Sequence, residues 1–89
     1  MKSLEFKALG GKMIKLDIKL TGNKISFIRI TGDFFIHPEE AIVEIEKILT
    51  NARIHQVGEI LKDYKKSNKV LFVGININDL VNIIQKAKC

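Results

Sequence analysis

The amino-acid pattern changes its period once along the chain, at Pro38, and this change most restricts the folds that the chain can adopt. Before Pro38, apolar and polar residues alternate, and alternation places every second side chain on one face of a β-strand. After Pro38, apolar residues recur every three or four positions, which is the period of a helix with one buried face. Strands followed by helices indicate an α+β domain of the order βββααα, in which the helices pack on one face of the sheet.

Three strands are expected before Pro38, in the segments "LEFKA", "KMIKLDIKL" and "NKISFIRIT". The first two are separated by Gly10 and Gly11, and the last two by "TGNK" at residues 21–24. Glycine and asparagine supply the positive φ angles that tight hairpins need, so both connections favour antiparallel neighbours. The three strands are therefore predicted to form an antiparallel β-meander.

The third of these strands departs from strict alternation. Ile25 and Phe27 fall on one face, whereas Ile28 and Ile30 fall on the other. Either a β-bulge lies in this strand or both of its faces are covered by other parts of the molecule. We expect Phe27 to lie in the core.

Three helices are expected after Pro38. Pro38 suits the first turn of the first helix, and Asn51 can adopt the left-handed conformation that ends it. The second helix is expected at about residues 55–66, and the third after Asn78, which is a suitable N-cap. The segment "KVLFVGI" at residues 69–75 fits either a strand or an extended connector. The helical side chains expected to face the core are Ala41, Ile42, Ile45, Ile48, Leu49, Val57, Ile60, Leu61, Tyr64, Leu80, Val81, Ile84 and Ala87.

The composition favours one small domain over residues 1–89. The chain is 46% hydrophobic, and no apolar run approaches the roughly 18 residues that span a bilayer. The N-terminal segment lacks the apolar stretch of a signal peptide, so we expect a soluble, unprocessed, cytoplasmic protein. The net charge of +5 favours phosphates, nucleic acid or an acidic protein as partners.

The sequence has no pattern typical of catalysis or of metal binding. His37 and His55 lack carboxylates or cysteines at metal-ligand spacing, which favours a helix-start role for the first and a surface role for the second. Cys89 is the single cysteine, so neither an internal disulfide nor a cysteine-based metal site can form. The "GGK" at residues 10–12 is followed by Met13 and a strand, and not by Ser or Thr and a helix, so it is a hairpin turn and not a phosphate-binding loop.

The second strand carries Lys15 and Lys19 on its solvated face, where a basic sheet could bind the backbone of a nucleic acid. Proteins that bind single strands on a sheet also expose aromatic side chains on which the bases stack. This strand has none, so a solvated surface is the preferred interpretation.

The segment "GDFF" at residues 32–35 must stop the third strand abruptly and lead to the first helix. Gly32 permits the bend, and Asp33 is expected to accept hydrogen bonds from backbone amides of the turn. Two adjacent side chains cannot point the same way along a strand. One of Phe34 and Phe35 is therefore expected beneath the helices, and the other near the surface as a contact for a partner.

The order and spacing of these features resemble the C-terminal accessory domain of lipoate-protein ligases over nearly the whole chain. That family has a Lys-x-x-Gly-Gly start, which here is "KALGG" at residues 7–11. An apolar strand of the family ends in Gly-Asp-Phe-Phe, which matches residues 32–35. The following helix carries a Glu before a final Leu, matched by Glu46 and Leu49. The family often has Gly where this chain has Asn51, and Asn keeps the left-handed conformation available.

The resemblance implies a non-catalytic subunit, because the glycine-rich loop and the essential lysine of these ligases belong to a larger catalytic domain that this sequence lacks. Met1 lies close to the start of the motif, which indicates an accessory domain made as a separate chain. By resemblance, the chain forms a heterodimer with a catalytic subunit that uses ATP, Mg and lipoate to make lipoyl-AMP. The lipoyl group then passes to a lysine of a lipoyl domain or of H protein. The chain itself is expected to bind no cofactor and no metal.

The surface expected to contact the catalytic subunit is the first hairpin together with the GDFF segment. Glycines allow a close backbone approach there, and an exposed Phe supplies an anchor. The residues of this surface are Gly10, Gly11, Lys12, Gly32, Asp33, Phe34 and Phe35. A small basic nucleic-acid-binding module is the alternative function, and an adaptor in sulfur transfer is a third.

Overall fold

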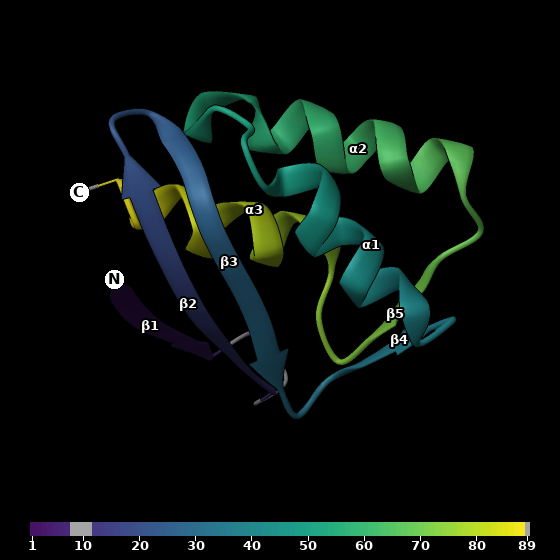
Figure 1. The fold of residues 1–89 in the computed structure, drawn as a ribbon. Coiled ribbons are helices and arrows are strands. Elements are labelled where there is room, and N and C mark those ends of the chain that lie inside the picture. Colours follow the sequence, from purple (N-terminus) through teal and green to yellow (C-terminus); the bar gives the residue numbers. More distant parts are fainter. Residues whose placement is uncertain (8–11, 89) are drawn as a thin grey trace.

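The computed structural model describes residues 1–7 and 12–88, which form a three-stranded sheet, a small two-stranded sheet and three α-helices (Figure 1). The elements are β1 (Lys2–Lys7), β2 (Met13–Thr21), β3 (Lys24–Gly32), β4 (Phe35–His37), α1 (Glu40–Leu49), the 3-10 turn η1 (Ile54–Gln56), α2 (Val57–Ser67), β5 (Leu71–Val73) and α3 (Ile77–Lys86). The predicted order of three strands and three helices is confirmed, with β4 and β5 as additions. Among the described residues, no helix is long and apolar enough to cross a membrane.

The main sheet has the order β1–β2–β3, and both neighbouring pairs are antiparallel, as a meander requires. Helices α1 and α3 pack on one face of this sheet, and α2 packs against both of them (Figure 1). The turn between β2 and β3 contains Gly22 at φ +60°, as predicted. Gly10 and Gly11, in the other connection, lie outside the described residues.

A β-bulge in β3 explains the irregular alternation of that strand. Ser26 is the extra residue, because its neighbours Ile25 and Phe27 pair with two consecutive residues of β2, Leu20 and Lys19. The bulge resets the alternation, so that the buried residues of β3 are Ile25, Ile28 and Ile30. Phe27 is exposed on the opposite face, so its prediction as a core residue is wrong. Of the two predicted alternatives, the bulge is the correct one.

The first helix agrees with the sequence in most respects. Asn51 has φ +73° and follows α1 in the left-handed conformation, as predicted. Pro38 lies just before the helix and not inside its first turn, and its carbonyl accepts a hydrogen bond from the Ala41 amide at 3.0 Å. Ile48 is exposed, because the centre of the buried stripe runs through Ala41, Ile45 and Leu49. Among the described residues, the fully buried large side chains are Ile14, Leu16, Ile18, Ile25, Ile45, Leu49, Ile54, Leu61, Leu80, Ile83, Ile84 and Val57.

The third helix begins earlier than the sequence predicts. Its N-cap is Asn76 and not Asn78. The Asn76 side chain accepts a hydrogen bond from the Asp79 amide at 2.9 Å, and the Asp79 carboxylate accepts one from the Asn76 amide at 3.0 Å. This reciprocal capping box needs an acidic residue three positions after the cap, and Asn78 is followed at that distance by Val81. The presence of Asp79 therefore selects Asn76.

We predict that Asn76→Ala lowers the free energy of unfolding by about 1 kcal/mol, the usual cost of losing an N-cap side chain. Asn78→Ala is the matched control, because Asn78 lies inside the helix and caps nothing, and we expect a change below about 0.5 kcal/mol. Urea unfolding followed by circular dichroism measures both. A larger loss for Asn78→Ala than for Asn76→Ala would contradict the assignment of the cap.

Candidate protein-interaction site

The GDFF segment forms a corner where the chain leaves the main sheet after β3 (Figure 1). Gly32 has φ +155°, and a Cβ at this position would collide with the carbonyl oxygen of Met13 and lie 2.8 Å from the Phe34 ring. The Met13 amide donates to Asp33 Oδ1 at 2.6 Å, and the Asp33 amide donates to the Met13 carbonyl at 3.2 Å. Asp33 accepts a backbone hydrogen bond, as predicted, but the donor belongs to the start of β2 and not to the turn itself. These contacts tie the end of β3 to the start of β2.

The two phenylalanines of the corner separate as predicted. Phe34 is partly buried and packs against the core, whereas Phe35 is 65% exposed. Strand β4 begins at Phe35, and the next residue, Ile36, takes the buried face of that strand. Phe35 must therefore point to the other face. Its role as a partner contact stays a prediction.

A small two-stranded sheet places further apolar side chains beside Phe35. Strand β4 pairs antiparallel with β5, and Phe35 lies opposite Val73. His37 lies opposite Leu71. Opposed residues share one face of a sheet, so we define Phe35, Leu71 and Val73 as the outer apolar face. Leu71 is 61% exposed and Val73 44%, so this face is open to solvent, and grouped exposed apolar side chains mark interaction surfaces.

Leu71 and Val73 are absent from the contact residues that the sequence predicts. They lie in the uninterrupted apolar run "VLFV", which hides the fact that alternate members are exposed. Strand β5 has three residues, too few to show a period of two. The pairing with β4 decides between the two predicted alternatives for residues 69–75, because it makes the middle of that segment a strand.

Lys12, a predicted contact residue, reaches the same end of the molecule. Its side chain packs on Gly74, which directly follows β5, and a Cβ on Gly74 would lie 2.7 Å from Lys12 Cγ. The structure thus brings Lys12 close to the end of β5, in the same region as Asp33 and Phe35. Gly10 and Gly11, the other predicted contact residues, cannot be placed because they lie outside the described part of the chain.

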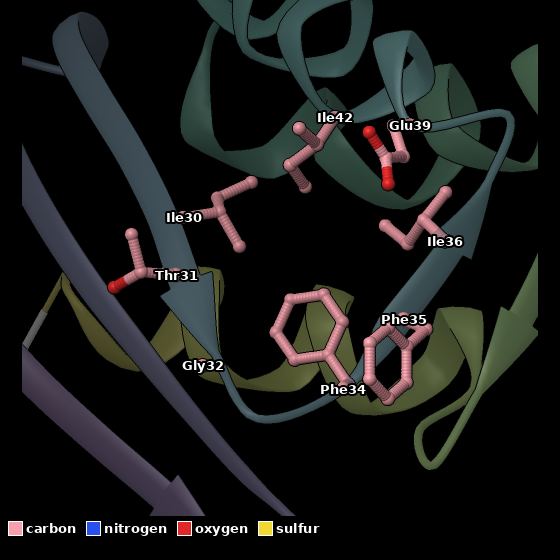
Figure 2. Close-up of a pocket in the computed structure, with 8 residues that line it drawn as sticks. All are labelled: Ile30, Thr31, Gly32, Phe34, Phe35, Ile36, Glu39 and Ile42. Carbon is pink, nitrogen blue, oxygen red and sulfur yellow. The ribbon is translucent and has the colours of Figure 1, made fainter.

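A pocket of about 270 Å³ lies between the end of β3, the corner and the start of α1. Figure 2 shows the rings of Phe34 and Phe35 on one side of it and the Glu39 carboxylate, near Ile36, on the side of α1. The remaining lining residues are Ile30, Thr31, Gly32 and Ile42. The pocket is therefore mostly apolar, with one carboxylate at its edge.

Two glutamates within α1, unlike the N-cap residue Glu39, have partners within the molecule. Glu46 Oε2 accepts a hydrogen bond from the Ile30 amide at 2.8 Å and so joins α1 to the edge of β3. Glu44 Oε2 accepts one from the Tyr64 hydroxyl at 3.3 Å, and burial together with the Glu44 charge raises the pKa of Tyr64. Within residues 1–7 and 12–88, the Glu39 carboxylate has neither a hydrogen bond nor an ion pair. Glu39 is available to a group from outside the chain.

The remaining candidate residues do not assemble a reactive site. His37 and His55 are exposed, the first in β4 and the second in η1. No group of three or more His, Cys, Asp or Glu that could hold a metal ion occurs in the described part of the chain. Cys89 lies outside that part. The exposed apolar side chains of the outer apolar face therefore remain the strongest candidate site in the described residues, and its use as a protein interface stays a prediction.

Comparisons with known proteins point to one group of ligases. No family model matches the chain. It is 32% identical over 85 residues to lipoate-protein ligase A subunit 2 of Thermoplasma acidophilum, which covers 96% of this chain and 88% of that protein. It also matches a solved structure from an archaeal lipoylation system of the same organism. That system consists of a bipartite lipoate protein ligase and its E2 lipoyl domain. That match has a TM-score of 0.87 and 31% identity and covers 94% of this chain and 93% of the other.

Proposed function

The chain belongs to the family of lipoate-protein ligase A subunit 2, and on this premise we propose that it is the non-catalytic accessory subunit of a two-chain lipoate-protein ligase. Its partner is a separate catalytic subunit. Together they use ATP, Mg and lipoate to form lipoyl-AMP, and the lipoyl group then passes to a lysine of a lipoyl domain or of H protein. The chain supports the activation step but supplies no catalytic residue to it.

The observation that carries this proposal is the position of the GDFF residues, which also carry the family resemblance. They form the corner, supply both aromatic rings of the pocket and begin the outer apolar face. The exposed ring of Phe35, flanked by Val73, is the kind of anchor that dominates binding energy in protein interfaces. A surface of this kind supports association with another chain.

A physical reason for the division of labour follows from the chemistry of an acyl-adenylate, which water can hydrolyse. A subunit that packs over the pocket of the catalytic chain excludes water and orders the loops around the nucleotide. Such a role requires a rigid, folded cover and no reactive group of its own. We expect the corner and the outer apolar face to provide that cover.

Nucleic-acid binding is the second candidate function, and one observation favours it. Phe27 is exposed on the outer face of the main sheet and lies opposite Lys19. The basic face therefore carries one aromatic ring on which a base could stack, although the sequence predicted none there. Salt-dependent retention of the chain on single-stranded DNA would support this function. A single ring is a weak platform, because successive bases stack on several aromatic side chains.

Pyrophosphate release tests the proposed function. The catalytic subunit from the same organism is incubated with ATP, Mg and lipoate, with and without this chain, and an unrelated basic protein of similar size serves as the control. We expect release that depends on lipoate only when both subunits are present.

A further inference from the structure

The pocket at the corner does not suit the nucleotide or the acyl-adenylate of the proposed reaction, because its lining residues include no lysine or arginine that could pair with a phosphate group. Its volume of about 270 Å³ lies below the roughly 300 to 1,000 Å³ of typical small-molecule sites. Its lining is mostly apolar. A pocket of this size and chemistry suits one apolar side chain of a protein partner, as buried anchors in interfaces do.

The edge of the pocket is acidic, although the chain as a whole is basic. Residues 39–49 contain four glutamates and one lysine, whereas the net charge of the chain is +5. Glu39 lines the pocket, is the N-cap residue of α1 and has no partner within the described residues. The positive end of the helix dipole stabilises a negative charge at this position. The cations of the main sheet, such as Lys15 and Lys19, lie on its other face.

Resting on the proposed function, we infer that this pocket receives an apolar side chain of the catalytic subunit that stands next to a lysine or an arginine, and that Glu39 pairs with that cation. An acidic edge attracts such a segment and repels an acidic one, so Glu39 sets the specificity of docking as well as its strength. Phe35 belongs both to the pocket and to the outer apolar face. A single partner surface therefore covers both.

The test compares variants of two neighbouring glutamates. Each variant is titrated into the catalytic subunit in a calorimeter, which gives the dissociation constant of the complex. Glu39→Lys should raise the dissociation constant at least tenfold, and Glu39→Gln should raise it less. Glu40→Lys is the matched control, because Glu40 is in the same turn with the same charge but does not line the pocket, and we expect less than a threefold change. The salt dependence of binding should also be weaker for Glu39→Gln than for the unmodified chain.

A second variant tests the pocket itself. Ile42→Phe enlarges a lining side chain and fills part of the space. If a partner side chain inserts there, the filled pocket should raise the dissociation constant at least fivefold. If the partner instead binds the apolar surface without inserting a side chain, binding should be unchanged or tighter, because the variant exposes no less apolar area. Thermal unfolding of the variant alone shows whether it is folded. If it is not folded, the comparison of Glu39→Lys with Glu40→Lys tests the inference without it.

The outcomes separate this inference from the proposed function. If Glu39→Lys weakens binding of the catalytic subunit and Glu40→Lys does not, the pairing of Glu39 with a cation of that subunit is supported. Equal effects of Glu39→Lys and Glu40→Lys, or no effect of either, overturn it while the complex itself still supports the accessory-subunit function. Failure of the unmodified chain to bind the catalytic subunit overturns both.

Discussion

Replacing Gly32 by alanine is expected to lower the free energy of unfolding by about 3 kcal/mol or more. The added Cβ would meet the carbonyl oxygen of Met13 in β2 and would lie 2.8 Å from the ring of Phe34. The backbone at φ +155° is also one that side chains with a Cβ rarely adopt. Relief of the collision would move Met13 and break its two hydrogen bonds with Asp33. The corner and the folded state are therefore expected to weaken together.

Gly22→Ala is the control for this prediction. Gly22 also has a positive φ, +60°, but nothing lies within 4 Å of the position that a Cβ would take. We expect a cost of about 1 kcal/mol, from the backbone conformation alone. Denaturant unfolding of both variants measures the difference. Equal costs at the two glycines would mean that the close contact at the corner does not exist in solution.

Replacing Phe35 by alanine is expected to weaken binding of the catalytic subunit about 30-fold, which corresponds to about 2 kcal/mol, and to leave the fold intact. The ring is 65% exposed in the isolated chain, so its removal takes little from the core. Phe34→Ala should act in the opposite way. Phe34 packs against the core, and its loss should lower the free energy of unfolding by about 2 kcal/mol, less than for a fully buried phenylalanine.

Phe27→Ala is the matched control for this pair, because Phe27 is an exposed phenylalanine on the outer face of the main sheet. We expect neither the stability nor the association to change appreciably. Calorimetric titration and thermal unfolding of the three variants give both quantities. Normal binding by a folded Phe35→Ala variant, or a loss of binding in Phe27→Ala, would move the interface away from the corner.

Long regular patterns in the sequence predicted most of the fold. Strand β2 shows the clearest alternation, and the three helices carry apolar stripes that extend over several turns. The exceptions are local. The extra residue Ser26 depends on the pairing of β3 with β2, and the choice of Asn76 over Asn78 depends on one reciprocal pair of hydrogen bonds. Neither feature changes the spacing of apolar residues along the whole element. The sequence patterns therefore predicted the three strands of the main sheet and the three helices, but they did not reveal β4, and they misplaced Phe27, Ile48 and the start of α3.

The candidate site was predicted in part. The GDFF motif indicated the corner, and adjacency in a strand indicated that Phe34 and Phe35 would separate. Which ring is exposed depends on where β4 begins, and its partner β5 lies far along the chain. For the same reason the sequence did not reveal Leu71 and Val73, which join Phe35 through strand pairing. Contacts between distant short segments leave no periodic signal in the residues themselves.

The measurement that most directly tests the accessory-subunit function is lipoate- and ATP-dependent pyrophosphate release by the catalytic subunit, with and without this chain. We predict release only when both are present, and at a limiting concentration of the accessory chain we predict lower release with Phe35→Ala than with Phe27→Ala. Full activity of the catalytic subunit alone, together with no detectable binding of this chain, would contradict the proposed function and would bring nucleic-acid binding forward.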